Sequence, residues 1–448
     1  MKKRSRWLTA VVAGAALSPV LAGTAGAQSD DSLANQLGFV PLTDAPQTCS
    51  ASTIEWSPSV IPTKVMSAGD PATPDPNALP TQTTVPGEND MIAFSPDHRF
   101  LFTVAETGAN GAVTKLDLQS GAKTILTQRS DFNRLDPIKW YGPSSSLLIG
   151  EENGSTGLVT QVDPTTGATT DLPWLGSMSH EGIAFGSDGA IWLGDENHTG
   201  AIYKAVPNNV SDLTQGGTLS AMVDNGSFST VNPATAVADA FNGGATLFDR
   251  PEDFDQRDGR IYFTVTEPAD DAQISSTPGH PVRAGGVYTV NDTHTPHVVQ
   301  FVALNDPATG ALGQQVPGLQ FPDNLAIDGK GNVWIHEDIP DDTKATPTNV
   351  HSKQYRNMQD ELWVALPDKN GDGVSDGMYK FANMGNSATA TPCQNEWTGG
   401  AFLDSRTFFV TQQHADNPVW KVQLPKGKSL HDDQQGSSGD NGQGNEQG

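Results

Sequence analysis

The sequence predicts an all-β protein, a β-propeller of about six blades, with five or seven blades as alternatives. Composition is the first reason: the 448 residues include 46 Gly and 31 Pro, and only 17% are charged. Turn formers therefore outweigh helix formers, which favours many short strands joined by loops. Repetition is the second reason, because one hairpin pattern recurs six times between residues 88 and 425. A β-sandwich is the alternative fold, but it would not explain the repeats.

Each repeat opens with an acidic residue and continues as two alternating apolar runs separated by a turn. The second run ends in further polar residues. The six repeats begin at Asp90, Asp136, Glu181, Glu252, Asp323 and Glu396. Additional strand pairs follow these hairpins, and an inner hairpin followed by an outer one is typical of propeller blades. Two insertions, residues 206–244 and 266–284, are expected to form loops or short helices.

Both ends of the chain are expected to lie outside the propeller. Residues 1–27 have a basic start, an apolar run and a small-residue site, so we predict a signal peptide cleaved after Ala27 and a secreted protein. An N-terminal membrane anchor is the alternative, which the short apolar run disfavours. Residues 28–87 are assigned to a lead-in and a Pro/Thr-rich connector, 88–425 to the propeller and 426–448 to a disordered polar tail.

The charge balance excludes several classes of partner. Asp and Glu total 52 against 26 Lys and Arg, which gives a net charge of -26. Such a chain repels nucleic acids and anionic membranes, and no internal run approaches the ~18 apolar residues of a membrane span. We expect a monomer that acts on a small molecule. Its two cysteines, Cys49 and Cys393, are expected to form a disulfide in an oxidising compartment, with two buried or metal-binding thiols as the alternative.

Acidic residues at both ends of each repeat predict a metal site. They lie between 16 residues apart (Asp90 to Glu106) and 14 apart (Glu181 to Asp195), as expected for two strands of about 5–6 residues and a turn. Both ends of a hairpin meet at one edge, so several blades would crowd carboxylates together, which requires hard cations such as Ca²⁺. Solvated turn residues are the alternative. The predicted ligands are Glu151, Glu152, Glu181, Glu252, Glu267, Asp323, Asn324 and Asp338.

Other motifs are less specific. Residues 368–376 resemble the start of a calcium loop but have Tyr379 at the twelfth position, so they predict either a peripheral Ca²⁺ site or a polar turn. His180, His336 and His414 adjoin the acidic positions and would either bind metal or form hydrogen bonds. No G-x-S-x-G, P-loop or H-E-x-x-H motif occurs, so serine hydrolase and P-loop functions lack their usual support.

Several segments resemble the PhoX-type alkaline phosphatases. Glu396-Trp-Thr-Gly with Phe409-Val-Thr-Gln-Gln-His414 resembles the closing element of that family, and Arg250-Pro-Glu252 followed by residues 259–267 is similar to another of its elements. His180-Glu181-Gly182 and Pro322-Asp323-Asn324-Leu325 also resemble family segments. The resemblance implies an exported propeller that holds calcium and iron and hydrolyses phosphomonoesters. Gly150 stands where the family usually has an iron-ligating cysteine, and Ala415 stands where it has proline.

These observations predict metal-dependent phosphoester hydrolysis at a carboxylate-rich channel mouth, with Arg250 or Arg283 holding the phosphate. Two alternatives stay open. Residues 181–196 and 323–338 are equally similar to calcium propellers of the gluconolactonase type, which implies a calcium-dependent lactonase or esterase. A non-catalytic secreted propeller, stiffened by Ca²⁺ and binding a partner through its loops, is the second.

Overall fold

The computed structural model describes residues 30–425, except 45–46, 49–50, 52, 59, 77, 79–80, 224–226, 268–280, 293–296, 305–313, 317–318, 339–358, 386–394 and 415. The predicted signal peptide, the polar tail and both cysteines, Cys49 and Cys393, lie outside the described residues. Neither described α-helix is long and apolar enough to cross a membrane.

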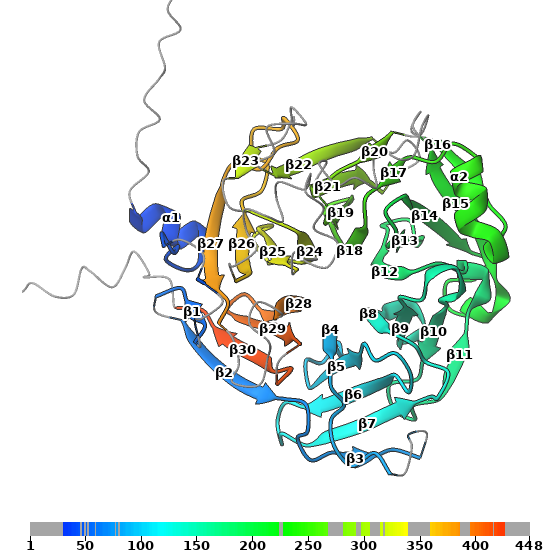
Figure 1. Ribbon diagram of the computed structural model, residues 1–448, viewed down its shortest axis with the longest axis horizontal. Coiled ribbons are helices and arrows are strands. Elements are labelled where there is room, and N and C mark those ends of the chain that lie inside the picture. Colours follow the sequence, from blue (N-terminus) through cyan, green and yellow to red (C-terminus); the bar gives the residue numbers. More distant parts are fainter. Residues whose placement is uncertain are drawn as a thin grey trace, which may run out of the picture.

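Six sheets, which consist mainly of antiparallel strand pairs, surround one central axis (Figure 1). The inner strands touch one another in cyclic order, and the last contacts the first. They are β4 (Asn89–Phe94), β8 (Leu135–Tyr141), β12 (His180–Phe185), β18 (Pro251–Arg257), β24 (Pro322–Ile327) and β28 (Glu396–Asp404). This arrangement confirms the predicted β-propeller and its count of about six blades.

The outer strands continue each blade away from the axis. In blade one they are β5 (Phe100–Ala105), β6 (Ala112–Asp117), β7 (Lys123–Gln128) and β3 (Thr73–Pro74), and in blade two β9 (Ser146–Glu151), β10 (Val159–Val162) and β11 (Thr169–Asp171). Blade three holds β13 (Ile191–Asp195), β14 (Gly200–Pro207), β15 (Gly217–Val223) and β16 (Ser227–Thr230), with β17 (Leu247–Phe248) and β20 (Val282–Arg283) beside it.

Blade four continues through β19 (Arg260–Val265), β21 (Gly286–Asn291), β22 (Val298–Leu304) and β23 (Gln314–Val316), and blade five through β25 (Val333–Glu337), β26 (Glu361–Ala365), β27 (Met378–Asn383) and β1 (Glu55–Trp56). Blade six contains β29 (Thr407–Gln413), β30 (Val419–Gln423) and β2 (Ile61–Met66). The helices are α1 (Asp30–Leu37) and α2 (Ala236–Asn242), and single 3-10 turns are η1 (Gly142–Ser144), η2 (Gly154–Thr156), η3 (Pro173–Leu175), η4 (Leu213–Gln215) and η5 (Pro233–Thr235).

The beginning of the chain completes the last two blades. β1 pairs with β27, and β2 runs antiparallel to β30 with Thr63 opposite Lys421. Residues 55–74, which the sequence assigns to a lead-in and connector, thus contribute three strands to the ring. These pairings cover sheet edges that would otherwise expose unpaired backbone groups.

Apolar packing between neighbouring blades holds the ring together. Trp334 of blade five lies 4.7 Å from Phe381 of the same blade and 4.8 Å from Phe408 of blade six, measured between ring centres. Trp334 and Phe408 are fully buried. Nearer the axis the contacts are polar: Lys139 of β8 reaches Asp253 of β18 at 3.1 Å, and the same carboxylate accepts the amide of Leu325 in β24. Blades two, four and five are therefore tied together across the centre.

Candidate metal centre

Carboxylates from all six blades gather where the inner hairpins end. Among the described residues, four groups of three each bring one oxygen per residue within 4.8 Å of the others. They are Asp90, Glu106 and Asp136; Asp136, Glu152 and Glu181; Glu181, Glu196 and Glu252; and Asp323, Asp338 and Glu396. Asp136 belongs to the first and second groups, and Glu181 belongs to the second and third. These three groups therefore form one continuous chain of carboxylates across blades one to four. The fourth group lies on blades five and six. The four groups together are called the carboxylate centre.

A repeated β-bulge aims the first acid of five of the six hairpins. In β4, β8, β12, β18 and β24 the pairing register with the second strand shifts immediately after the first residue. The bulged residues include Asp90, Asp136, Glu181, Glu252 and Asp323. A bulge leaves residues out of the ladder and turns their side chains, which is a common device beside active sites. Local backbone geometry, repeated five times, thus presents these carboxylates to the centre.

Side-chain alternation selects the second acid. Three hairpins end in two consecutive acids, and in each the first turns away from the centre. Glu151 accepts the amides of Asn133 at 2.9 Å and Leu158 at 3.3 Å. Its neighbour Glu152 lies in a carboxylate group. Because successive residues of a strand point to opposite sides, only one acid of each pair can reach the centre.

The other two acidic pairs divide in the same way. Asp195 accepts a hydrogen bond from the amide of Ser179 at 3.2 Å, whereas Glu196 belongs to a carboxylate group. Glu337 accepts hydrogen bonds from the amides of Gln320 at 2.8 Å and Glu361 at 2.7 Å, whereas Asp338 belongs to a carboxylate group.

Burial of so many acids strongly perturbs their ionisation. Burial raises the pKa of Asp136, Glu181 and Asp323 well above the ordinary carboxyl value, and neighbouring carboxylates raise each pKa further. Several of the oxygens also have no hydrogen-bond partner in the described structure: Asp90 Oδ1, Asp136 Oδ1, Glu252 Oε2, Asp323 Oδ1 and the amide oxygen of Asn324. Unpartnered buried oxygens are costly. An all-oxygen set of this kind fits hard cations such as Ca²⁺.

Thiolate-bound iron does not fit at Gly150. This residue lies in β9, and a Cβ placed on it would stand 2.7 Å from both His180 Cβ and Pro137 Cγ. Neither contact involves the far end of a flexible side chain, so a cysteine there would require the backbone or its neighbours to move. The nearest carboxylate group, Asp136, Glu152 and Glu181, offers oxygen ligands alone.

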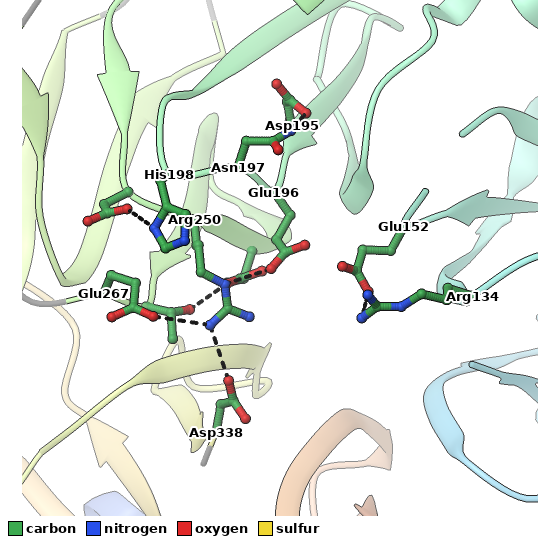
Figure 2. Close-up of polar contacts among 12 residues, drawn as sticks. Arg134, Glu152, Asp195, Glu196, Asn197, His198, Arg250, Glu267 and Asp338 are labelled. Atoms are coloured by element: carbon green, nitrogen blue, oxygen red, sulfur yellow. Dashed lines mark hydrogen bonds and ion pairs between the residues drawn. The ribbon is translucent and has the colours of Figure 1, made fainter. Parts of the chain in front are cut away.

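Two arginines stand among the carboxylates (Figure 2). Arg250 donates from Nε to Glu196 at 2.6 Å, and its Nη1 lies 3.3 Å from Asp338 and 3.7 Å from Glu267. Burial is the largest effect on Glu196 and raises its pKa. The charge and hydrogen bond of Arg250, the hydrogen bond with Glu152 and the charge of Arg134 together outweigh burial, so the net pKa is lowered. Arg134 pairs with Glu106 at 2.6 Å and with Glu152.

Most sequence-predicted ligands meet at this centre, while others have different surroundings. Glu152, Glu181, Glu252, Asp323 and Asp338 belong to carboxylate groups, Glu267 pairs with Arg250, and Asn324 is buried beside Asp323. Glu151 caps backbone amides, and the guanidinium of Arg283 lies 5.9 Å from the ring centre of Phe248. The predicted set omitted Asp90, Glu106, Asp136, Glu196, Glu396 and Arg134. The hairpin repeat marks the five acids, and Arg134 is marked by its place two residues before Asp136, which matches that of Arg250 before Glu252.

The three histidines and the calcium-like loop make local contacts. His180 and His336 contact the carbonyls of Gly176 and Thr398, and burial lowers both pKa values to about 4. His414 lies 3.0 Å from Glu88 and 3.4 Å from Glu396. In the loop, Asp368 accepts the amides of Gly371 and Gly373, as in a polar turn.

Comparison with known proteins gives the family. The sequence profile described as "Alkaline phosphatase PhoX" matches residues 110–416, about two thirds of the chain. Pseudomonas fluorescens PhoX, solved with vanadate as a transition-state analogue, is similar in structure with a TM-score of 0.62 and 15% identity, covering 88% of this chain and 99% of that one. A Xanthomonas campestris gluconolactonase has a TM-score of 0.46 and 14% identity, covering 86% and 97%. No curated protein sequence matches. The chain belongs to the PhoX family of alkaline phosphatases.

Proposed function

We propose that this chain is an exported, metal-dependent phosphomonoesterase whose reaction takes place at the carboxylate centre. The continuous chain of carboxylates from Asp90 to Glu252, with Arg250 inserted beside it, is the observation that carries the proposal. Family membership supports the same reaction class. The residues 1–27 pattern supports export, and the buried unpartnered oxygens support several Ca²⁺ ions.

The acidic residues of the centre would hold cations, and the arginine beside them would hold substrate. Bound divalent cations would supply charge stabilisation for a phosphoryl group and activation of water. Asp136 and Glu181, each shared by two carboxylate groups, would hold neighbouring cations at fixed spacing. Arg250, 22% exposed and surrounded by acids from three blades, would orient the phosphate through its planar fork of donors. Arg283 remains a second predicted phosphate contact.

Replacement of Glu252 by Gln tests the proposal. Glu252 is buried, accepts a hydrogen bond from Thr266 at 2.7 Å, and has one oxygen without a partner. The variant keeps the shape and the Thr266 bond but loses the ligand charge, so we expect p-nitrophenyl phosphate hydrolysis to be abolished with little loss of folding. Metal content by mass spectrometry, on protein purified without chelator, should fall in parallel.

Three outcomes would count against the proposal. Retained turnover in Glu252→Gln would remove this residue from the site. Hydrolysis of lactones without hydrolysis of phosphate esters would favour a lactonase. A wild-type protein that holds metal, loses thermal stability with chelator and turns over no ester would favour the non-catalytic propeller.

A further inference from the structure

Arg134 and Arg250 occupy equivalent positions in blades two and four. Each directly precedes an inner strand, β8 or β18, and each stands two residues before a carboxylate of the centre, Asp136 or Glu252. Both adopt a left-handed backbone conformation, with φ of 52° and 58°. A non-glycine residue in this conformation is strained and persists only where the surrounding structure holds it.

The backbone contacts of the two arginines are also equivalent. The Arg134 amide donates to Thr107 of blade one at 2.7 Å, and its carbonyl accepts the amide of Glu152 in its own blade at 2.8 Å. Arg250 likewise donates to Asn197 of blade three at 3.0 Å and accepts from Thr266 of blade four at 3.1 Å. Each arginine is therefore fixed between its own blade and the preceding one.

The turn itself belongs to the fold, whereas the arginine is specific to these two blades. Glu88 and Phe321 have the same left-handed conformation before β4 and β24, with φ of 52° and 39°. A strained turn would tolerate other residues there, as these two positions show. Placing a long cation at two of them, both beside the carboxylates, indicates a role for the charge.

The two guanidinium groups face each other across a pair of acids. Arg134 contacts Glu106 and Glu152, and Arg250 contacts Glu196. The side chains of Glu152 and Glu196 interact with each other, so the two arginines lie on opposite sides of this pair, as Figure 2 shows. Arg134 is the more accessible of the two, with 48% of its side chain exposed against 22% for Arg250.

Cation binding would change what Arg134 contacts. Glu106 and Glu152, its two partners, each belong to a carboxylate group suited to a metal ion. A divalent cation in either group takes up the negative charge that Arg134 balances in this structure and repels the guanidinium. The donors of Arg134 are then available to an anion, and a guanidinium matches phosphate oxygens in a bidentate manner.

We propose that Arg134 is a second phosphate-binding residue that, opposite Arg250, makes the site select phosphomonoester dianions over phosphodiesters. This proposal rests on the proposed function and assigns a residue to its preference for monoesters. A monoester presents three non-bridging oxygens, which can meet the cations and both guanidinium groups together. A diester has two such oxygens and one less charge, so one guanidinium would face an ester group that cannot satisfy its donors.

Two substrates with the same leaving group test the selectivity. Steady-state kinetics would compare p-nitrophenyl phosphate with methyl p-nitrophenyl phosphate for the wild type, Arg134→Gln, Arg134→Lys and Arg99→Gln. Arg99 is the matched control, because it is 53% exposed and pairs with Asp117 at 2.9 Å on an outer strand pair. Calorimetric titration of the calcium-loaded proteins with inorganic phosphate, together with metal analysis, gives a readout independent of turnover.

For Arg134→Gln we expect KM for the monoester and Kd for phosphate to rise about 10- to 100-fold, the worth of a hydrogen bond to a charged group. The diester should change much less, Arg134→Lys should retain part of the effect, and metal content should stay constant. Arg99→Gln should behave as the wild type.

An unchanged phosphate Kd in Arg134→Gln would overturn the proposal. Loss of bound metal in both Arg134 variants, or an equal loss with both substrates, would also overturn it by making Arg134 a structural partner of the carboxylates. A wild type that binds phosphate but hydrolyses neither ester would contradict the proposed function alone, and the phosphate titration would still decide the role of Arg134.

Discussion

At the scale of single residues, adjacent acids in this chain have different roles. Glu151 and Glu152 are chemically identical neighbours, yet one accepts two loop amides and the other lies in a carboxylate group. The difference comes from strand alternation, since consecutive side chains leave the backbone on opposite sides. An acidic residue at a strand end therefore does not indicate a role until the side of the strand to which it points is known.

Glutamine substitutions at these two positions should separate the two roles. We expect Glu152→Gln to lower metal content and phosphatase activity far more than Glu151→Gln, because only Glu152 shares a candidate cation with Asp136 and Glu181. Glu151→Gln should instead lower the free energy of unfolding by about 1 kcal/mol, through weaker caps to Asn133 and Leu158. Metal analysis and urea denaturation of both variants check this, and a larger metal loss in Glu151→Gln would contradict it.

At the scale of elements, the bulged inner hairpin is the unit that builds the site. The acidic residues that open and close it are visible in the sequence, and from them the repeat predicts the propeller and five of the residues found in the carboxylate groups. The bulge was not visible, because it depends on pairing with the second strand rather than on residue type. Arg134 shares with Arg250 its spacing of two residues before the opening acid, but a spacing that occurs in two repeats indicates a role only once the equivalent turns before β8 and β18 are seen.

The short N-terminal strands escaped prediction for a related reason. β1 has two residues and β2 contains Pro62, so neither gives a clear alternating pattern. Their strand conformation depends on pairing with β27 and β30, which come more than three hundred residues later. Local sequence does not encode such a pairing.

Two positions on β2 test its contribution to stability. Met66 is 1% exposed and packs with Val85, Phe409 and Val419, whereas Ile61 on the same strand is 65% exposed. Met66→Ala should lower the free energy of unfolding by about 2–5 kcal/mol, as cavity-forming substitutions do. Ile61→Ala is the control and should change it by less than about 0.5 kcal/mol. Equal, small effects measured by urea denaturation would mean that β2 contributes little to the closed ring.

At the scale of the whole molecule, we expect the carboxylate centre to couple the stability of the fold to cation binding. The net charge is -26, and acids from six blades face one another with two arginines between them. Buried like charges oppose the folded state, and a ligand that binds only the folded state stabilises it.

Removal of metal should therefore lower the melting temperature. We expect chelator to reduce Tm of the wild type by several degrees or more, and added Ca²⁺ to restore it. In the metal-free state Glu252→Gln should melt above the wild type, because burial raises the pKa of Glu252 and disfavours its ionised form, a cost that the neutral amide does not have. Differential scanning calorimetry with and without Ca²⁺ measures both effects, and a Tm insensitive to chelator would show that the acids hold no cation.

The pairing of β2 with β30 also affects the order in which parts of the protein fold. The strand that completes blade six precedes its partner β30 by more than three hundred residues, so most of the described chain is synthesised between the two. Folding that depends on such distant pairing is slow, because a long loop must close before any contact forms. Since the carboxylates come from all six blades, the complete centre exists only after that final step. Assembly of the carboxylate centre is therefore expected to come late in folding, after the first and last described strands of blade six have paired.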